Sequence, residues 1–380
     1  MEFLVFGEDW GRHPSSSQHL LQAIGQQYDV HWINSIGLRQ PTLNHRDLRR
    51  MWEKVTTRSA DSRSNNTAPE QNGLLDEPTT IIKPLVWPMA QHPILKALNS
   101  HLLKRQLSEK TYRRIVWAAL PSAVDYLDIC DSDLVVYYCG DDFTALAGVD
   151  HQLAATAEQR LIARADIIFA CSPALLAKFP VRKTVLLPHG VHLSQFAKPT
   201  HCPEDIDPSS PCIGFYGSLN NWLDQTLIIK LAKARPNIHF YFIGRQDCDT
   251  AMLRQQENIT LLPAKPHQQL ARYLQHWTMA ILPFIDNEQI RACNPLKLRE
   301  YLAAGCPVIS SAFPATTPYR SVITTATSET EWLNAIDQYS QWTPYQRQSH
   351  SKRAYQIVAN ESWECRAAQA IEVIEQRLSH

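Results

Sequence analysis

The fold is decided by the stretch NPLKLREYLAAGCPVI, residues 294–309. We expect a helix over about 295–304 that ends at Gly305, because glycine adopts the left-handed conformation that closes many helices. The run 308–311 then predicts a short strand. Since the strands of this half are nearly all apolar, both faces of their sheet should be covered by helices. A helix that leads directly into a buried strand is the repeating unit of an α/β domain.

The same alternation continues in both directions along the chain. Strands are predicted at residues 3–6, 28–33, 115–120, 134–138, 167–170, 213–216, 239–243, 259–262 and 279–282. Helices are predicted at residues 19–24, 158–165 and 224–234, and in the tail at 345–378. The sequence therefore predicts two α/β halves, each built around a mostly parallel sheet.

A proline-rich segment divides the two halves. Residues 198–211 hold four prolines and several acids, a composition typical of a domain linker. We place the first domain at 1–197, the second at 212–345 and C-terminal helices at 346–380. Residues 57–80 are rich in polar side chains and are predicted to form a mobile loop. Because ligands of open α/β sheets bind at the carboxyl ends of the strands, we expect the function in a cleft between the domains.

Composition narrows the class of protein. The 380 residues include 37 Lys and Arg against 37 Asp and Glu, so net charge gives no argument for nucleic acid as a partner. The nine cysteines are odd in number and form no CxxC pair, which favours free thiols in a reducing compartment. The N-terminus lacks the basic start of a signal peptide, and no apolar run reaches the ~18 residues of a membrane span. We therefore expect a cytoplasmic protein.

The helix predicted at 295–304 carries the strongest chemical pattern. Its first turn offers free backbone N–H groups and the positive end of the helix dipole to a phosphate, and Lys297 adds a charge there. Glu300 lies three residues further on, hence on the same helix face. The alternative is a surface helix with a Lys–Glu pair. Gly217 and Ser218 follow a strand, where a glycine turn lets the backbone approach a ligand closely.

The stretch 294–309 resembles the donor-binding motif PxKxxEYxAxGxPVI of GT-B glycosyltransferases of the group 1, or family 4-like, class. Motifs similar to those of bacterial exopolysaccharide and teichuronic-acid-type transferases recur along nearly the whole chain. These further motifs lie at residues 12–14, 136–143, 158–173, 187–192, 213–224 and 362–367.

The resemblance implies a GT-B fold: two Rossmann-like domains with an interdomain cleft. The first domain would bind the acceptor and the second the nucleotide sugar, and the helices at 346–380 would cross back to the first. In this family the helix N-terminus faces the diphosphate, and the glutamate one turn later binds the ribose hydroxyls. The donor-binding residues that we predict are Gly217, Ser218, Arg245, Asn294, Pro295, Leu296, Lys297 and Glu300.

Two departures from the family pattern leave the stereochemistry, retaining or inverting, open. Retaining members carry an acid eight residues before the ribose-binding glutamate, where this chain has Ala292. The Arg/Lys-Gly pair that commonly follows the first strand of the donor domain is missing from 220–224. Lys297 and Arg245 would then have to balance the diphosphate charge.

Asp141 and Asp142 are the candidates for the general base. They follow a predicted strand of the first domain, and adjacent side chains in an extended segment point opposite ways, so only one can face the acceptor. Two neighbouring carboxylates also raise one pKa toward a useful range for proton abstraction. The alternative is that both acids cap the following turn. The Asp-Ser-Asp run at 131–133 suits a turn better than a metal site, so we predict no catalytic metal.

Residues 83–117 form a basic stretch, with seven Lys and Arg against one acid, Glu109. A solvated helix face explains such a run, and so does peripheral contact with an anionic membrane that carries a lipid-linked acceptor.

Taken together, the sequence predicts a hexosyl- or glucuronosyl-type glycosyltransferase that acts without a metal or other cofactor. It would move a sugar from a nucleotide sugar, expected to be UDP-linked, to a glycan or lipid-linked acceptor during cell-surface polysaccharide synthesis at the inner face of the membrane. The alternatives are a GT-B nucleotide-sugar epimerase and a catalytically inactive GT-B scaffold.

Overall fold

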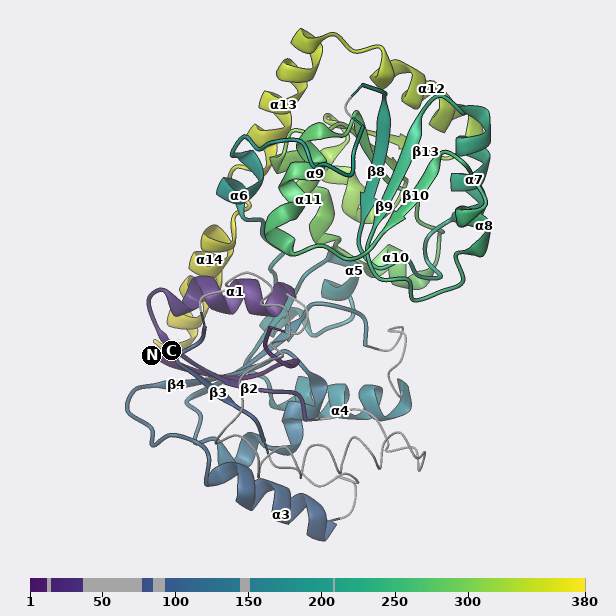
Figure 1. Ribbon diagram of the computed structural model, residues 1–380. Coiled ribbons are helices and arrows are strands. Elements are labelled where there is room, and N and C mark those ends of the chain that lie inside the picture. Colours follow the sequence, from purple (N-terminus) through teal and green to yellow (C-terminus); the bar gives the residue numbers. More distant parts are fainter. Residues whose placement is uncertain (12–14, 37–76, 85–92, 144–150, 208, 380) are drawn as a thin grey trace, which may run out of the picture.

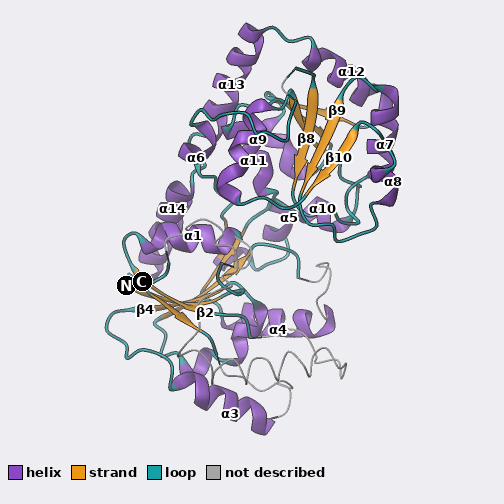
Figure 2. Cartoon of the chain, viewed as in Figure 1, coloured by secondary structure: helices purple, strands orange, loops and turns teal. Residues whose placement is uncertain are grey.

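The computed structural model describes residues 1–11, 15–36, 77–84, 93–143, 151–207 and 209–379. Two lobes stand one above the other in Figure 1, and each consists of a β-sheet with helices on its faces (Figure 2). Most of the loop predicted at 57–80 lies outside the described residues.

The first sheet has seven parallel strands in the order β3-β2-β1-β4-β5-β6-β7. Its strands are β1 (Glu2–Phe6), β2 (Asp29–Ile33), β3 (Thr80–Ile82), β4 (Arg114–Ala118), β5 (Leu134–Cys139), β6 (Ile167–Ala170) and β7 (Thr184–Leu186). The connections contain the helices α1 (Ser16–Gly25), α3 (Pro93–Lys104), α4 (His151–Arg164) and α5 (Pro173–Leu176) and the 3₁₀ turns η2 (Pro121–Asp125), η3 (Leu127–Ile129) and η4 (Val181–Lys183).

The second sheet repeats the pattern with six parallel strands in the order β10-β9-β8-β11-β12-β13. Its strands are β8 (Cys212–Tyr216), β9 (His239–Ile243), β10 (Ile259–Leu262), β11 (Met279–Leu282), β12 (Val308–Ser311) and β13 (Ile323–Ala326). The helical elements are α6 (Leu193–Ala197), α7 (Gln225–Ala234), α8 (Ala251–Arg254), η5 (His267–Gln269), α9 (Leu270–His276), α10 (Glu288–Ala292), α11 (Leu296–Ala303), η6 (Pro314–Tyr319), α12 (Glu329–Ser340), α13 (Pro344–Val358) and α14 (Trp363–Leu378).

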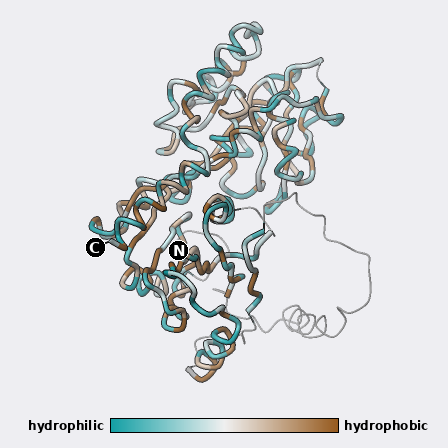
Figure 3. Tube along the Cα trace, turned by 90° about the vertical axis from the view of Figure 1, so that its left-hand side faces the viewer, coloured by the Kyte–Doolittle hydropathy of each residue, from teal (hydrophilic) through white to brown (hydrophobic). Residues whose placement is uncertain are grey.

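These two parallel sheets confirm the predicted fold class of two Rossmann-like domains. The apolar alternation along β1 explains the layering. Phe3 and Val5 join the core on the face covered by α1 and α14, while Leu4 and Phe6 join the core on the face covered by α4. In Figure 3 the hydrophobic stretches of the trace run through both lobes. The sequence did not predict β3, β7 and β13, three short strands at sheet edges where the apolar signal is weakest.

The packing corrects two of the predicted domain boundaries. Phe196 and Ile206 are buried in the core of the second domain, so the first domain ends nearer residue 190 than 197, and part of the predicted linker packs rather than spans. Val358 places α13 in the second core as well, and only α14 crosses back to pack on α1. Composition gave the wrong boundary because a few apolar residues in a polar segment are enough to anchor it.

The two interdomain crossings lie side by side. Val191 donates its backbone N–H to the carbonyl of Glu361 over 2.9 Å and pairs with Ser362 as an isolated bridge. A Cβ at Gly190 would lie 2.8 Å from Trp363, so the crossing needs glycine at this point. Both connections between the domains therefore pass through one narrow place.

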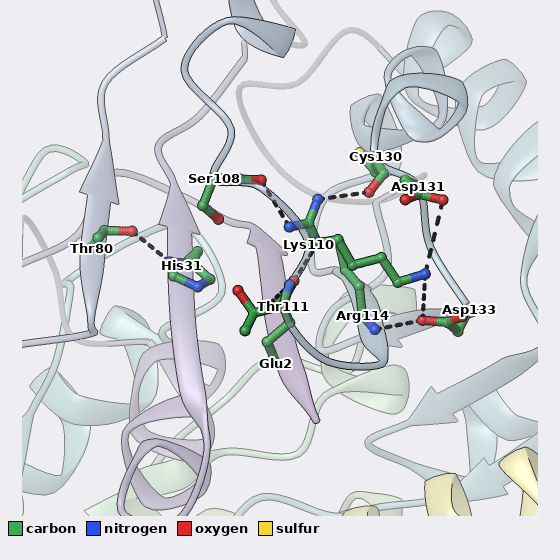
Figure 4. Close-up of polar contacts among 10 residues, drawn as sticks. All are labelled: Glu2, His31, Thr80, Ser108, Lys110, Thr111, Arg114, Cys130, Asp131 and Asp133. Atoms are coloured by element: carbon green, nitrogen blue, oxygen red, sulfur yellow. Dashed lines mark hydrogen bonds and ion pairs between the residues drawn. The ribbon is translucent and has the colours of Figure 1, made fainter.

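The basic stretch at 83–117 is partly neutralised by acids from elsewhere in the chain. Arg114 pairs with Glu2 at 2.6 Å, and both side chains are buried. Lys110 pairs with Asp133 at 2.8 Å, next to Asp131 (Figure 4). Asp133 also accepts the backbone N–H of Arg114, so this turn has a structural role. Within the described ranges, no group of three or more His, Cys, Asp or Glu side chains is placed to hold a metal ion.

None of the helices in the described part of the chain combines the length and the apolar character needed to span a bilayer.

Candidate functional site

The carboxyl ends of β8 and β9 are made of glycine turns in unusual conformations. Gly217 has φ +133° and Gly244 has φ +153°, values that favour glycine. A Cβ at Gly217 would lie 2.4 Å from the Nζ atom of Lys297, and a Cβ at Gly244 would lie 2.0 Å from the carbonyl oxygen of Gly217. The strand order reverses between β8 and β11, which is the place where open α/β sheets bind ligands. Lys297 reaches this switch point only because no side chain stands there.

The Lys297 ammonium lies among aromatic rings. It sits 4.6 Å from the centroid of Phe215 and 5.6 Å from that of Phe284, within range of cation–π attraction. Burial lowers its pKa to about 8, although Glu300 acts in the opposite direction. Pro295 is the N-cap of α11 and has no side-chain oxygen to bind the amides of the first turn. A desolvated cation beside a helix N-terminus is suited to an anionic ligand.

Glu300 lies one turn along α11 and is buried. It accepts hydrogen bonds from the hydroxyl of Tyr216 and from Nε2 of His267, the latter at 2.6 Å. Burial by itself raises the pKa of Glu300, but the charge and hydrogen bond of His267, the Tyr216 hydroxyl and Lys297 outweigh it and leave the pKa below its usual value. Glu300 is therefore an ionised acceptor whose two oxygens are each held by a protein donor.

Asn294 ties the start of α11 to the first domain. Its Nδ2 donates to the carbonyl of Cys171, and its Oδ1 accepts from Arg299. Ser172 makes a second tie, because its hydroxyl donates to the carbonyl of Ala292 over 2.7 Å. The N-terminus of α11 is thus fastened to the end of β6, and the first domain must lie beside it.

Asp141 and Asp142 follow β5 and differ in their surroundings. Asp142 pairs with Lys178, and only 9% of its side chain is exposed. Asp141 keeps solvent access. Although the residue as a whole is exposed, the protein around its carboxyl partly desolvates it; this, followed by the charges of Glu8 and Asp142, raises the pKa of Asp141 to about 6. Of the two carboxyls, Asp141 has the pKa that suits a general base near neutral pH.

Electrostatic contacts link Asp141 to α11. The thiol of Cys171 donates to the carbonyl of Gly140, next to Asp141, over 3.0 Å, and the carbonyl of Cys171 accepts from Asn294. Burial, followed by the charge of Asp141, raises the pKa of the Cys293 thiol to about 12, while Lys297 acts in the opposite direction. One thiol thus lies within the influence of an acid of the first domain and of a cation of the second. Asp141 of the first domain therefore lies near the end of α11 that carries Lys297.

The remaining predicted residues are placed more loosely. The guanidinium of Arg245 pairs with Asp247 in its own loop, with 59% of the side chain exposed, while its carbonyl accepts from Leu219. Leu296 packs against the core of the first domain. Ser218 is half-buried directly after Gly217. The roles of the eight donor residues and of Asp141 and Asp142 stay predictions.

Sequence reasoning missed several residues of this site. Tyr216 stood within a motif, but its place in an apolar strand indicated only core. Phe284 likewise gave no signal beyond its apolar character. His267 follows Pro266 in a segment without a motif, and Glu8 follows the first strand as an ordinary loop acid. Of these residues, only Glu8 could have been suggested by its position in the sequence. It directly follows a predicted strand, and acids at the carboxyl ends of strands face the ligand side of the sheet.

A family model described as "Glycosyl transferases group 1" matches residues 210–340, the part of the chain that holds β8 to α12. These residues are a group 1 glycosyl transferase domain. The group 1 domain contains Gly217, Lys297 and Glu300. A relative from Bacillus subtilis (strain 168), named as the teichuronic acid biosynthesis glycosyltransferase TuaH, is 26% identical over 227 residues. That match covers 54% of this chain and 57% of the relative, so it spans little more than half the length of either protein.

Solved structures share the architecture of the whole chain. Anabaena HepE in complex with UDP-glucose superposes with a TM-score of 0.67 at 12% identity, covering 99% of this chain and 100% of HepE. Sucrose-phosphate synthase from Thermosynechococcus elongatus gives a TM-score of 0.70 at 13% identity, covering 100% and 99% of the two chains. At this identity the likeness shows the fold, which is GT-B.

Proposed function

We propose that this protein is a glycosyltransferase that moves a hexosyl or glucuronosyl group from a UDP-sugar to a hydroxyl of a glycan or lipid-linked acceptor, in cell-surface polysaccharide synthesis. One observation carries the proposal. Lys297 and the first turn of α11 lie against Gly217, and Glu300 follows one turn later with both oxygens held. This spacing suits a nucleoside diphosphate, with charge for the phosphates and an acceptor for the ribose.

Different comparisons support different parts of this proposal. The group 1 domain supports sugar transfer, and HepE was solved with UDP-glucose. TuaH is named for teichuronic acid synthesis, which supports a cell-surface polysaccharide as the product.

In the proposed mechanism, each domain supplies one function. Lys297 and the amides of α11 stabilise the diphosphate as it leaves, since charge that develops in the transition state is met by fixed positive groups. Asp141 takes the proton of the acceptor hydroxyl. We propose that no metal takes part, because an ammonium and a helix N-terminus already supply the positive charge that the leaving group needs.

A thermal-shift screen over nucleotide sugars tests the donor site. A nucleotide at 100 times its Kd adds about 2.7 kcal/mol to the free energy of unfolding. We expect Glu300→Ala to remove most of the shift caused by UDP-sugars, because the ribose loses its acceptor. Glu300→Gln, which keeps the side-chain volume, guards against a folding defect, and Glu257→Ala on the surface is the control. A full shift in both Glu300 variants would contradict the assignment.

Incubation of the cognate UDP-sugar with and without acceptor separates transfer from its alternatives. An epimerase would convert or hydrolyse the donor in the absence of acceptor. An inactive scaffold would bind the nucleotide and turn over no acceptor.

We also propose peripheral contact with an anionic membrane, through a smaller patch than the whole stretch 83–117. On α3, Ile94 and Leu98 are 72% and 40% exposed and lie one turn apart, and the exposed Lys104 and Arg105 stand at its end. Three other cations of the stretch are already paired with acids: Lys96, Lys110 and Arg114. Apolar side chains next to unburied cations are the pattern of an interfacial helix. The cytoplasmic location remains a prediction.

Co-sedimentation with phosphatidylglycerol vesicles at low salt tests this patch. We expect the double change Lys104→Glu and Arg105→Glu to weaken binding at least about 30-fold, at ~1 kcal/mol for each basic residue lost near the surface, because the two new carboxylates are repelled in addition. The matched control reverses Lys352 and Arg353, another exposed basic pair on a helix, and should leave binding unchanged. Equal losses in the two double variants would point to general charge, not to α3.

A further inference from the structure

A histidine that lies outside every predicted motif forms a hydrogen bond with the carboxylate of Glu300. We infer that His267 is a positioning residue for Glu300, whose Nε2–H group holds the carboxylate in the orientation that binds the ribose of the nucleotide. The inference rests on the proposed function, because it takes Glu300 as the ribose acceptor.

The contacts of the carboxylate show what the histidine does. His267 lies in η5, after β10, and its Nε2 is 2.6 Å from Oε1 of Glu300. Tyr216, at the end of β8, donates to the other oxygen, Oε2. Two donors from separate elements fix the plane of the carboxylate. Each oxygen accepts one further hydrogen bond, which matches the two vicinal hydroxyls of a ribose.

A glutamine sets the tautomer of His267. The Nε2 atom of Gln195 lies 3.0 Å from the backbone carbonyl of His267 and 3.2 Å from Nδ1 of its ring. Since the carbonyl can only accept, the amide nitrogen must face it and donate. In the neutral imidazole Nδ1 then meets a donor and accepts, so the ring proton stands on Nε2, facing Glu300. In the protonated ring Nε2 carries a proton as well. Turning the amide over would bring two oxygens together at the carbonyl.

Packing from the domain boundary holds the ring in place. His267 lies 5.3 Å from His19 of α1 and 5.5 Å from Phe196 of α6, measured between ring centroids. His192 lies at 6.4 Å and contacts His19 over 2.9 Å between ring nitrogens. Burial lowers the pKa of both His19 and His192, and neighbouring histidines lower it further: His192 and His267 act on His19, and His267 acts on His192. Neither ring therefore adds a positive charge beside His267 at pH 7.

The charge of Glu300 acts on His267 in the opposite sense. Burial would lower the pKa of His267, but the charge and hydrogen bond of Glu300 outweigh it and raise the pKa above its usual value. The same pair lowers the pKa of Glu300. Both pKa shifts arise from the same favourable contact between His267 and Glu300. A nucleotide could bind to Glu300 without any rearrangement of that contact.

Titration calorimetry with UDP and with 2′,3′-dideoxy-UDP tests the inference. His267→Phe keeps a ring and removes the donor; we expect it to weaken UDP binding by about tenfold to a hundredfold, the effect of a lost hydrogen bond to a charged group. Binding of dideoxy-UDP, which has no hydroxyls for Glu300 to hold, should change by about threefold or less. His267→Gln should bind UDP within about threefold of the unmodified protein, because its amide can donate from the position of Nε2.

Controls separate positioning from folding and from failure of the proposed function. His239→Ala, in the same domain and bonded to Thr260, should leave both affinities unchanged. If His267→Phe does not fold, His267→Ala takes its place. Equal losses for UDP and dideoxy-UDP, a Gln variant as weak as the Phe variant, or no loss at all would overturn the inference and leave the proposed function standing. Unmodified protein that binds no UDP would overturn both.

Discussion

Replacing Lys297 by methionine is expected to lower kcat/KM for sugar transfer by about a hundredfold to a thousandfold, the usual effect of removing one group that stabilises developing negative charge. The loss should be larger than that of any other donor-site change, because the ammonium stands within the turn that Gly217 leaves open. Methionine keeps the chain length and the contacts with the rings of Phe215 and Phe284. Steady-state kinetics with a UDP-sugar measures the effect.

The same change should not lower stability. Burial lowers the pKa of Lys297 to about 8 in the folded protein, whereas an unfolded lysine keeps its proton to about 10.5. Between these values the unfolded chain binds more protons, so the contribution of Lys297 to stability rises with pH there and is unfavourable below pH 8. Lys297→Met should therefore melt at the same temperature as the unmodified protein or higher.

Lys230→Met is the matched control for this prediction. Lys230 is an exposed lysine of α7 in the same domain, 3.4 Å from Glu329, and its loss should leave kcat/KM unchanged. A Lys297→Met protein that transfers sugar within about threefold of the normal rate would show that the diphosphate charge is met elsewhere.

The second large effect is expected at Asp141. Asp141→Asn should lower kcat by about 10² to 10⁴, the range of general base catalysis, with little change in UDP affinity because the residue lies in the first domain. Asp142→Asn is the comparison: this carboxylate already pairs with Lys178, so its loss should affect stability more than rate. A rate loss confined to Asp142→Asn would show that Asp142, and not Asp141, is the general base.

The pH dependence follows from the two shifted groups. A base must be ionised, so kcat/KM should rise as pH increases toward the Asp141 pKa of about 6 and level off above it. It should fall again above about pH 8, where Lys297 loses its charge. Asp141→Asn should lose the acidic limb and keep the alkaline one, and Lys297→Met should do the reverse. A profile that is flat from pH 5 to 9 in the unmodified protein would exclude both assignments.

Part of the proposed donor site can be predicted from local sequence. A helix of 3.6 residues per turn places Lys297 and Glu300 on one face, and Gly305 marks its end, so the stretch 294–309 predicted the geometry around α11 without any other part of the chain. The apolar runs of the strands likewise predicted two parallel sheets covered on both faces. The strand order reverses between β1 and β4 and between β8 and β11, the places where open α/β sheets bind ligands.

The residues that contact α11 from other parts of the chain could not be predicted from local sequence. His267 stands 33 positions before Glu300, and Asn294 bonds a carbonyl 123 positions away. The sequence did not distinguish Asp141 from Asp142 as candidates for the general base. The structure does, because Lys178 pairs with Asp142. Three cations of the basic stretch proved to be paired with acids outside it.

The sequence alone thus determined the fold class, the position of the helix α11 and the residue types on it, because these depend on periodicity and turn chemistry within a few residues. The tertiary structure alone decided which donors hold Glu300, which aspartate pairs with Lys178, where the chain crosses between domains and which basic residues stay exposed. These features depend on strand order and on the docking of α14 against α1, which bring together residues too far apart in the chain for any local pattern to connect.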